Sequence, residues 1–157
     1  MYANIDLKNR LITSDNIPTT LLVSDVSCKD ECGFSGVIVE WVDAYNNLYQ
    51  KMYELIRLPI YISGSVCRCN NHNKAVGGSP TSLHLYSRAG DISVMNSGSE
   101  HIKHIKLLAE TAVDYFTCVI YYPYKNFVHC DVRETSIKKT MTQTRTGLIN
   151  GFDFTLR

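Results

Sequence analysis

Apolar residues recur every three or four positions between residues 37 and 58, which is the period of an amphipathic helix. The stripe consists of Val39, Val42, Tyr45, Tyr49, Met52 and Ile56. Pro59 follows this stripe and ends the predicted helix, because proline restricts the residue before it and has no N–H to donate. Residues 60–63, Ile-Tyr-Ile-Ser, alternate as in a short strand. The pattern thus predicts a long helix that leads directly into a strand.

A second helix is predicted from Ser97 to about Phe116. Ser97 and Glu100 have the spacing of a capping box. The apolar stripe that follows consists of Ile102, Ile105, Ala109, Ala112 and Phe116. Residues 83–95 predict two short strands around a turn near residues 87 and 88, and residues 118–122 and 126–132 predict two more.

The remaining segments are more polar. Residues 64–82 are rich in Gly, Ser, Asn and Pro and predict a long loop, and a loop of that length is typical of a functional segment. Residues 1–36 are expected to be irregular, and Asn150-Gly151 predicts a tight hairpin turn. Together the pattern predicts an α+β fold, a small antiparallel sheet packed with two main helices. We expect a single domain over residues 1–157, with its core at 37–133 and a C-terminal extension at 134–157.

Composition narrows the choice of partners. Hydrophobic residues make up 45% and charged residues 20%, and 16 basic against 15 acidic residues give a net charge of +1. So small a charge gives no reason to expect binding to nucleic acid or to a membrane surface. No apolar stretch approaches the roughly 20 residues of a membrane span. We expect a monomer.

Candidate metal ligands cluster in two stretches. His84 and Asp91 lie on opposite sides of the predicted turn, and period-two alternation places His129 and Asp131 on the same face of the last predicted strand. Catalytic zinc takes three His or carboxylate ligands and leaves one position open, so neighbouring strands can supply such a site. Histidines on strands are more often structural, and this spacing permits a zinc site without requiring one.

The order of motifs resembles a known family. The chain has His72-Asn73-x-x-Val76-Gly77-Gly78, then Ser82, His84, Ala89 and Asp91, then His129-x-Asp131-x-Arg133. This order is similar to that of the zinc D-alanyl-D-alanine carboxypeptidases and related endolysins, the group that includes lysostaphin-type peptidases and the hedgehog domain. The resemblance covers residues 37–133 and is nearest to the branch with His-x-Asp-x-Arg.

The resemblance implies a zinc site, and it implies one of two alternative functions for Asp131. Its zinc ligands match His84, Asp91 and His129. Asp131 is implied either as the catalytic base that accepts the proton of the attacking water or as the group that orients His129 or Arg133.

The resemblance also implies three groups that face the substrate. Arg68 matches an arginine that faces the scissile carbonyl and stabilises the oxyanion. Ser82 and Arg133 are implied as substrate-binding residues. The implied reaction is hydrolysis of an amide bond that adjoins a D-amino acid in a peptidoglycan stem peptide or cross-link, by a carboxypeptidase or endopeptidase. The first residues lack a secretory signal. We therefore expect synthesis in the cytoplasm and action on the cell wall after release, as a phage endolysin, or from a phage particle.

Three positions depart from the family pattern. Ser87 stands where the family turn has glycine, and about two extra residues separate Gly64 from Arg68. Asn126 stands where many members carry a catalytic Glu or Asp. Because Asn cannot act as a base, this position favours an alternative function, a non-catalytic zinc-stabilised binding module of the same fold.

The six cysteines are expected to be reduced thiols or to form a disulfide after release. Cys28-x3-Cys32 and Cys67-x-Cys69 also admit a four-thiolate structural zinc site, whereas His72 is expected only to shape its loop. Three tyrosines near the last ligand strand admit both a substrate groove and simple packing: Tyr121, Tyr122 and Tyr124.

Overall fold

A computed structural model describes residues 1–30 and 32–156. Its largest sheet has the strand order β3-β4-β6-β5-β7-β8. These strands are β3 (Ile60–Ile62), β4 (Ala89–Val94), β5 (Cys118–Tyr122), β6 (Phe127–Asp131), β7 (Lys139–Gln143) and β8 (Leu148–Asn150). Neighbouring strands are antiparallel except for β5 and β7, which are parallel. The predicted α+β fold is confirmed, with this one parallel pair as a departure from an all-antiparallel sheet.

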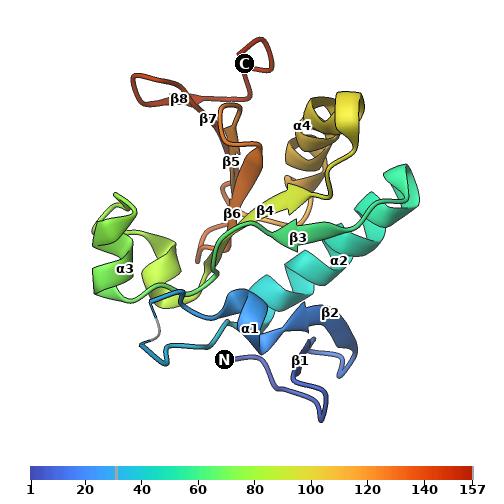
Figure 1. Ribbon diagram of the computed structural model, residues 1–157, viewed down its shortest axis with the longest axis vertical. Helices are drawn as coiled ribbons and strands as arrows, with labels where there is room; N and C mark the ends of the chain where they lie inside the picture. Colours follow the sequence, from blue (N-terminus) through green and yellow to red (C-terminus); the bar gives the residue numbers. More distant parts are fainter. Residues whose placement is uncertain (31, 157) are drawn as a thin grey trace.

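Two long helices cover one face of this sheet. The predicted first helix is α2 (Val39–Ile56), and it contacts α4 (His101–Ala112), which also contacts β4, β5 and β6. Figure 1 shows both helices on one side of the sheet and the short helix α3 (Asn70–Ala75) on the other. Trp41 of α2 lies so close to Gly90 of β4 that a Cβ there would be 2.3 Å from its ring. Glycine at this position therefore allows the helix to approach the strand.

Strand alternation separates the core from the candidate ligands. Val128 and Cys130 of β6 belong to the buried core, as do Ile92 and Val94 of β4. Because side chains along a strand alternate between faces, the intervening residues of β4 and β6 point away from the helices. The face opposite the helices is therefore the one that receives the polar residues of the predicted site.

The first 36 residues are more regular than expected. They contain β1 (Arg10–Ile12), β2 (Pro18–Leu22) and the single turn α1 (Val23–Val26). Leu11, Leu21 and Val26 are buried in the same hydrophobic core as α2. Elements of three to five residues are too short for a periodic pattern to show clearly, which explains why the sequence did not predict them.

Five further predictions differ from the structure. Leu83–Tyr86 forms a 3-10 helix, η1, and the expected loop at 64–82 contains α3. The capping box at Ser97 is absent: its Oγ bonds His104 Nδ1 at 2.8 Å, and a second 3-10 turn, η2 (Gly98–Glu100), precedes α4. The helix ends at residue 112 rather than about 116. The hairpin turn joining β7 to β8 falls at residues 144–147, before Asn150-Gly151.

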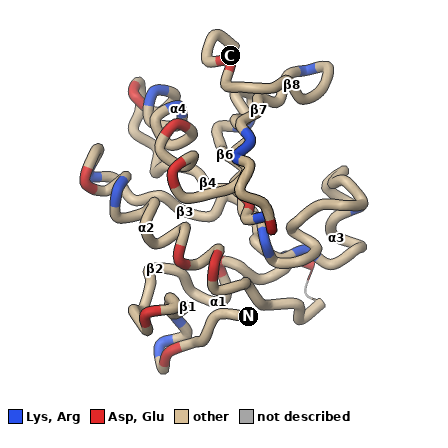
Figure 2. The backbone as a smooth tube through the Cα atoms, turned by 180° about the vertical axis from the view of Figure 1, so that it is seen from behind, with Lys and Arg blue, Asp and Glu red and all other residues tan. Residues whose placement is uncertain are grey.

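Charge is dispersed over the surface. Figure 2 shows basic and acidic residues distributed over helices, strands and loops, in keeping with the net charge of +1. Within the described ranges, no helix has both the length and the apolar character needed to cross a bilayer.

Candidate metal centre

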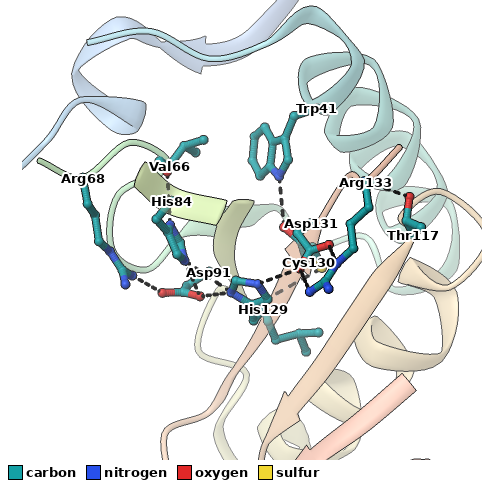
Figure 3. A network of polar contacts seen from close by, with 11 residues as sticks. Trp41, Val66, Arg68, His84, Asp91, Thr117, His129, Cys130, Asp131 and Arg133 are labelled. Carbon is teal, nitrogen blue, oxygen red and sulfur yellow. Dashed lines mark hydrogen bonds and ion pairs between the residues drawn. The ribbon is translucent and has the colours of Figure 1, made fainter. Parts of the chain in front are cut away.

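Three predicted ligands converge on the open face of the sheet. The register of β4 and β6 places Asp91 directly opposite His129, and η1 brings His84 beside them. His129 Nδ1 lies 3.0 Å from Asp91 Oδ1 and 3.3 Å from His84 Nε2, and His84 Nε2 lies 3.4 Å from Asp91 Oδ1. Figure 3 shows the three side chains pointing toward one another. We call this group the His–Asp–His centre.

The size of this triangle fits a zinc ion. Nitrogen and oxygen atoms bound to zinc at about 2.0–2.1 Å in tetrahedral geometry lie about 3.3 Å apart. The three measured edges, 3.0, 3.3 and 3.4 Å, agree with that separation. Two imidazoles and one carboxylate are also the donor set of catalytic zinc sites, which keep their fourth position open. Both the chemistry and the spacing of this group suit the metal.

The backbone of Val66 sets the orientation of His84. The carbonyl oxygen of Val66 lies 3.1 Å from His84 Nδ1, so Nδ1–H donates to it and the lone pair of Nε2 points into the centre. Burial lowers the pKa of His84, which favours the neutral imidazole that a metal requires. Val66 lies between Gly64 and Arg68, in the stretch that is about two residues longer than the family pattern. The contact between this carbonyl and His84 could not be predicted from the sequence, because a backbone carbonyl can come from any residue type.

Asp131 and Arg133 set the orientation of His129. His129 Nε2 lies 3.2 Å from Asp131 Oδ2, so Nε2–H donates to the carboxylate and Nδ1 is left for the centre. Arg133 donates to both oxygens of Asp131, Nε to Oδ1 at 2.7 Å and Nη2 to Oδ2 at 2.8 Å. The carboxylate is fully buried, and the imidazole ring lies between it and the centre. These contacts match the second function considered for Asp131, orientation of the ligand.

The electrostatics of the centre favour a cation. Burial lowers the pKa of His129, but the carboxylates of Asp131 and Asp91 on either side outweigh burial and raise it to about 9. For the carboxyl group of Asp91, burial acts in the opposite direction and raises the pKa. Hydrogen bonds with His129 and His84 outweigh burial and hold the pKa of Asp91 well below its usual range. When a metal ion binds, it replaces the proton on His129 Nδ1; His84 Nδ1–H and His129 Nε2–H then both point outward, and three lone pairs meet at the ion.

Arg68 contacts the centre through the second oxygen of the metal-site carboxylate. Its Nη2 donates to Asp91 Oδ2 at 2.6 Å, and its backbone N–H donates to the carbonyl of His84 at 3.0 Å. The side chains of Arg68 and Asp91 are both largely buried. A polar chain thus runs from Arg68 through the centre to Arg133, with an arginine at each end (Figure 3).

An open cavity of about 1270 Å³ lies over the centre. Its lining includes Arg68, Ser82 and Arg133, the three residues expected to face a substrate. Tyr122 and Tyr124 also line it, whereas Tyr121 is buried in the core. The C-terminal extension contributes a wall that the sequence did not predict, formed by Met141, Gln143, Thr144 and Leu148.

Ser87 occupies a position suited to glycine. It ends η1 with a φ of 57°, is fully buried, and its Oγ has no hydrogen-bond partner among the described residues. Left-handed backbone costs a residue with a Cβ roughly 1–2 kcal/mol, and an unpaired buried hydroxyl costs about 1–3 kcal/mol.

Glycine loses more conformational entropy on folding than serine, which offsets part of this gain. We therefore expect Ser87→Gly to stabilise the protein by about 1 kcal/mol net. Thermal unfolding measures this as a rise in Tm of about 2–4 °C. Ser87→Ala is the matched control, because it removes the hydroxyl but keeps the Cβ, and its gain should be smaller. A lower Tm for Ser87→Gly than for wild type would show that Ser87 is not strained.

Asn126 has a structural explanation. It lies in the turn between β5 and β6 with a φ of 54°, a conformation that Asn tolerates better than most residues. Its carbonyl accepts a hydrogen bond from Ser93 Oγ at 2.7 Å. The turn therefore accounts for asparagine at this position without reference to catalysis.

Comparison with known proteins gives one family. A sequence model of the family described as Peptidase M15 matches residues 19–131. The matched range contains all three residues of the His–Asp–His centre. Among curated proteins, none matches the chain.

Proposed function

The chain belongs to the peptidase M15 family, and on that basis we propose that it is a zinc-dependent peptidase that hydrolyses peptidoglycan. The bond we propose is an amide that adjoins a D-amino acid in a stem peptide or cross-link. The observation that carries the proposal is the His84–Asp91–His129 triangle, with edges of 3.0–3.4 Å, beneath an open cavity in a chain of a peptidase family. The peptidoglycan substrate rests on the resemblance of the surrounding motifs to D-alanyl-D-alanine peptidases.

Zinc held by His84, Asp91 and His129 would supply a Lewis acid and lower the pKa of a bound water towards about 7. The chain's own residues contribute orientation and charge. Asp131 holds His129 in the tautomer that presents Nδ1, and Val66 does the same for Nε2 of His84. Both ligands are therefore fixed before substrate binds, which reduces the reorganisation needed during the reaction.

Arg68 is the proposed oxyanion-stabilising residue. Its guanidinium lines the cavity and is held by Asp91 Oδ2, and a guanidinium has donors beyond those used in that contact. A fixed cation beside the scissile carbonyl stabilises the charge that develops on its oxygen. Ser82 and Arg133 line the same cavity and are proposed to bind the substrate's polar groups.

The alternative function, a non-catalytic zinc-stabilised module, rested on Asn126. Because the β5–β6 turn accounts for that residue, no observation favours the alternative over a peptidase. The provenance we propose, a phage endolysin or a virion-associated lysin, rests on the resemblance alone.

Digestion of purified sacculi tests the proposed function directly. The zinc-loaded protein should release new muropeptides, and mass spectrometry of these fragments identifies the bond that is cut. Chelator should abolish the release, and added zinc should restore it. If the loaded protein releases no fragments, or the same fragments with and without chelator, the proposed activity is wrong.

A further inference from the structure

A second group of possible metal ligands lies where the segment after α1 meets α3. The sulfur atoms of Cys28, Cys32 and Cys69 all lie within 4.8 Å of one another, although they come from segments about 40 residues apart. Figure 1 shows the segment that follows α1 passing beside α3. None of these cysteines lines the cavity over the His–Asp–His centre. With His72, we call this group the cysteine cluster.

The surroundings of the sulfur atoms resemble those of metal-bound thiolates. The backbone N–H of Cys69 donates to Cys28 Sγ at 3.4 Å, and the backbone N–H of His72 donates to Cys69 Sγ at 3.4 Å. Such donors stabilise negative charge on sulfur. Asp30 Oδ2 lies 3.1 Å from Cys69 Sγ and accepts a hydrogen bond while that thiol is protonated.

His72 is a candidate fourth donor that lies beside the sulfur atom of Cys28. Its Nδ1 lies 3.3 Å from Cys28 Sγ. In a tetrahedral site with zinc–sulfur bonds of about 2.3 Å and zinc–nitrogen bonds of about 2.0–2.1 Å, sulfur and nitrogen lie about 3.6 Å apart. The observed distance between Cys28 Sγ and His72 Nδ1 is therefore only a few tenths of an ångström shorter than in a tetrahedral zinc site.

Cys67 lies outside the cluster, which changes the ligand set considered from the sequence. Its Sγ is buried and donates to the carbonyl of Val26 at 2.8 Å. The ligand pattern becomes Cys28-x3-Cys32 with Cys69-x2-His72, in which the first pair has the two-to-four-residue gap common in structural zinc sites. His72, expected only to shape its loop, takes the place of Cys67.

We propose that the cysteine cluster binds one structural zinc ion through the thiolates of Cys28, Cys32 and Cys69 and through Nδ1 of His72. Binding releases the protons of those thiols that are not already ionised, and the resulting complex carries a net charge of −1. Four protein ligands leave no open position, so this zinc has a structural rather than a catalytic function. It would join the segment after α1 to α3, directly beside Arg68, and so stabilise the loop that lines the active-site cavity.

Zinc stoichiometry of the full chain separates the two sites. Elemental analysis after desalting should find two zinc ions per wild-type chain. One should remain in the variant His84→Ala/His129→Ala, and one in Cys28→Ser/Cys69→Ser. The matched control is Cys67→Ser, which removes a neighbouring buried thiol and should retain both ions. A single ion in wild type that disappears in the His84→Ala/His129→Ala variant would overturn the proposal, whatever the activity on sacculi.

Cobalt binding and alkylation test the ligands without relying on the cysteine variants to fold. Co²⁺ added to the zinc-free His84→Ala/His129→Ala chain should give intense sulfur-to-cobalt charge-transfer absorption. In the wild-type chain, zinc should protect the exposed Cys32 from iodoacetamide, and chelator should remove that protection. Either a lack of sulfur-to-cobalt absorption or equal labelling of Cys32 with and without zinc would contradict the site.

The fourth ligand is tested by a pair of variants. His72→Ala should weaken zinc binding at the cluster by at least about tenfold, since it removes a direct ligand. Asp30→Ala should change it little, because its carboxylate contacts only the protonated thiol of Cys69. The opposite order of effects would assign the fourth position to Asp30 and overturn the function proposed for His72.

Discussion

A chain with His129→Ala is expected to lose zinc from the His–Asp–His centre and to hydrolyse its substrate about 10³-fold more slowly, or worse. His129 supplies one corner of the ligand triangle, at 3.0 Å from Asp91 Oδ1 and 3.3 Å from His84 Nε2. Without it only two ligands remain, and the several kcal/mol of transition-state stabilisation that a metal provides are lost. Turnover of a peptidoglycan fragment and zinc content, measured on the same preparation, test both effects.

His104→Ala is the matched control for this loss. His104 lies on α4, where its Nδ1 bonds Ser97 Oγ, and it does not line the cavity. Its removal should leave zinc content and turnover unchanged. Wild-type turnover in the His129→Ala chain would remove His129 from the proposed centre.

A chain with Asp131→Asn is expected to bind zinc about 10–100-fold more weakly and to regain most of its turnover when zinc is in excess. The substitution keeps a hydrogen-bond acceptor near His129 Nε2 but removes the negative charge shared with Arg133. Residues that orient a metal ligand typically affect metal affinity by this factor. Zinc titration of turnover separates the change in affinity from any change in kcat.

The opposite result would make Asp131 the catalytic base. A base lost from the active site lowers kcat by about 10²–10⁴-fold, and excess zinc cannot restore it. Glu134→Gln is an informative comparison, because Glu134 is the third carboxylate that lines the cavity, and it is exposed and paired with Arg88 at 2.8 Å. If only Glu134→Gln lowers kcat at saturating zinc, proton transfer belongs to that residue rather than to Asp131.

One side of the metal centre could be predicted, because His129 and Asp131 lie on a strand with a clear period. Alternation along residues 127–131 separated His129 and Asp131 from the apolar Val128 and Cys130, and the sheet shows the same division. What the spacing left open was the register, which places Asp91 opposite His129. That register depends on the packing of the whole sheet, so the short motif alone permitted the site without requiring it.

Other parts of the site had no pattern to predict them. Residues 83–86 have an apolar spacing that fits a short strand as well as a 3-10 turn, and only the turn brings His84 to the centre. The carbonyl of Val66 orients that histidine, yet its side chain carries no information about the contact. The cavity wall formed by β7, β8 and the turn between them comes from a polar segment, and the pairing of β7 with β5 is parallel and distant in sequence.

The ligands of the cysteine cluster could also be predicted only in part from the sequence. Sequence spacing groups Cys67 with Cys69, but two cysteines separated by one residue do not reveal which of the two thiols is buried. In the fold Cys67 bonds the end of α1, while the first turn of α3 carries His72 toward Cys28. Because a helical turn places residues three apart on one side, the Cys69–His72 pair follows from α3, an element hidden in a stretch that resembles a loop.

Anomalous diffraction at the zinc absorption edge, from crystals grown with zinc, measures the central feature of this account most directly. We expect a peak about 2.0–2.2 Å from His84 Nε2, Asp91 Oδ1 and His129 Nδ1, with its remaining coordination position facing the cavity. A structure in which the two imidazoles turn away from each other, with no anomalous peak between them, would contradict it.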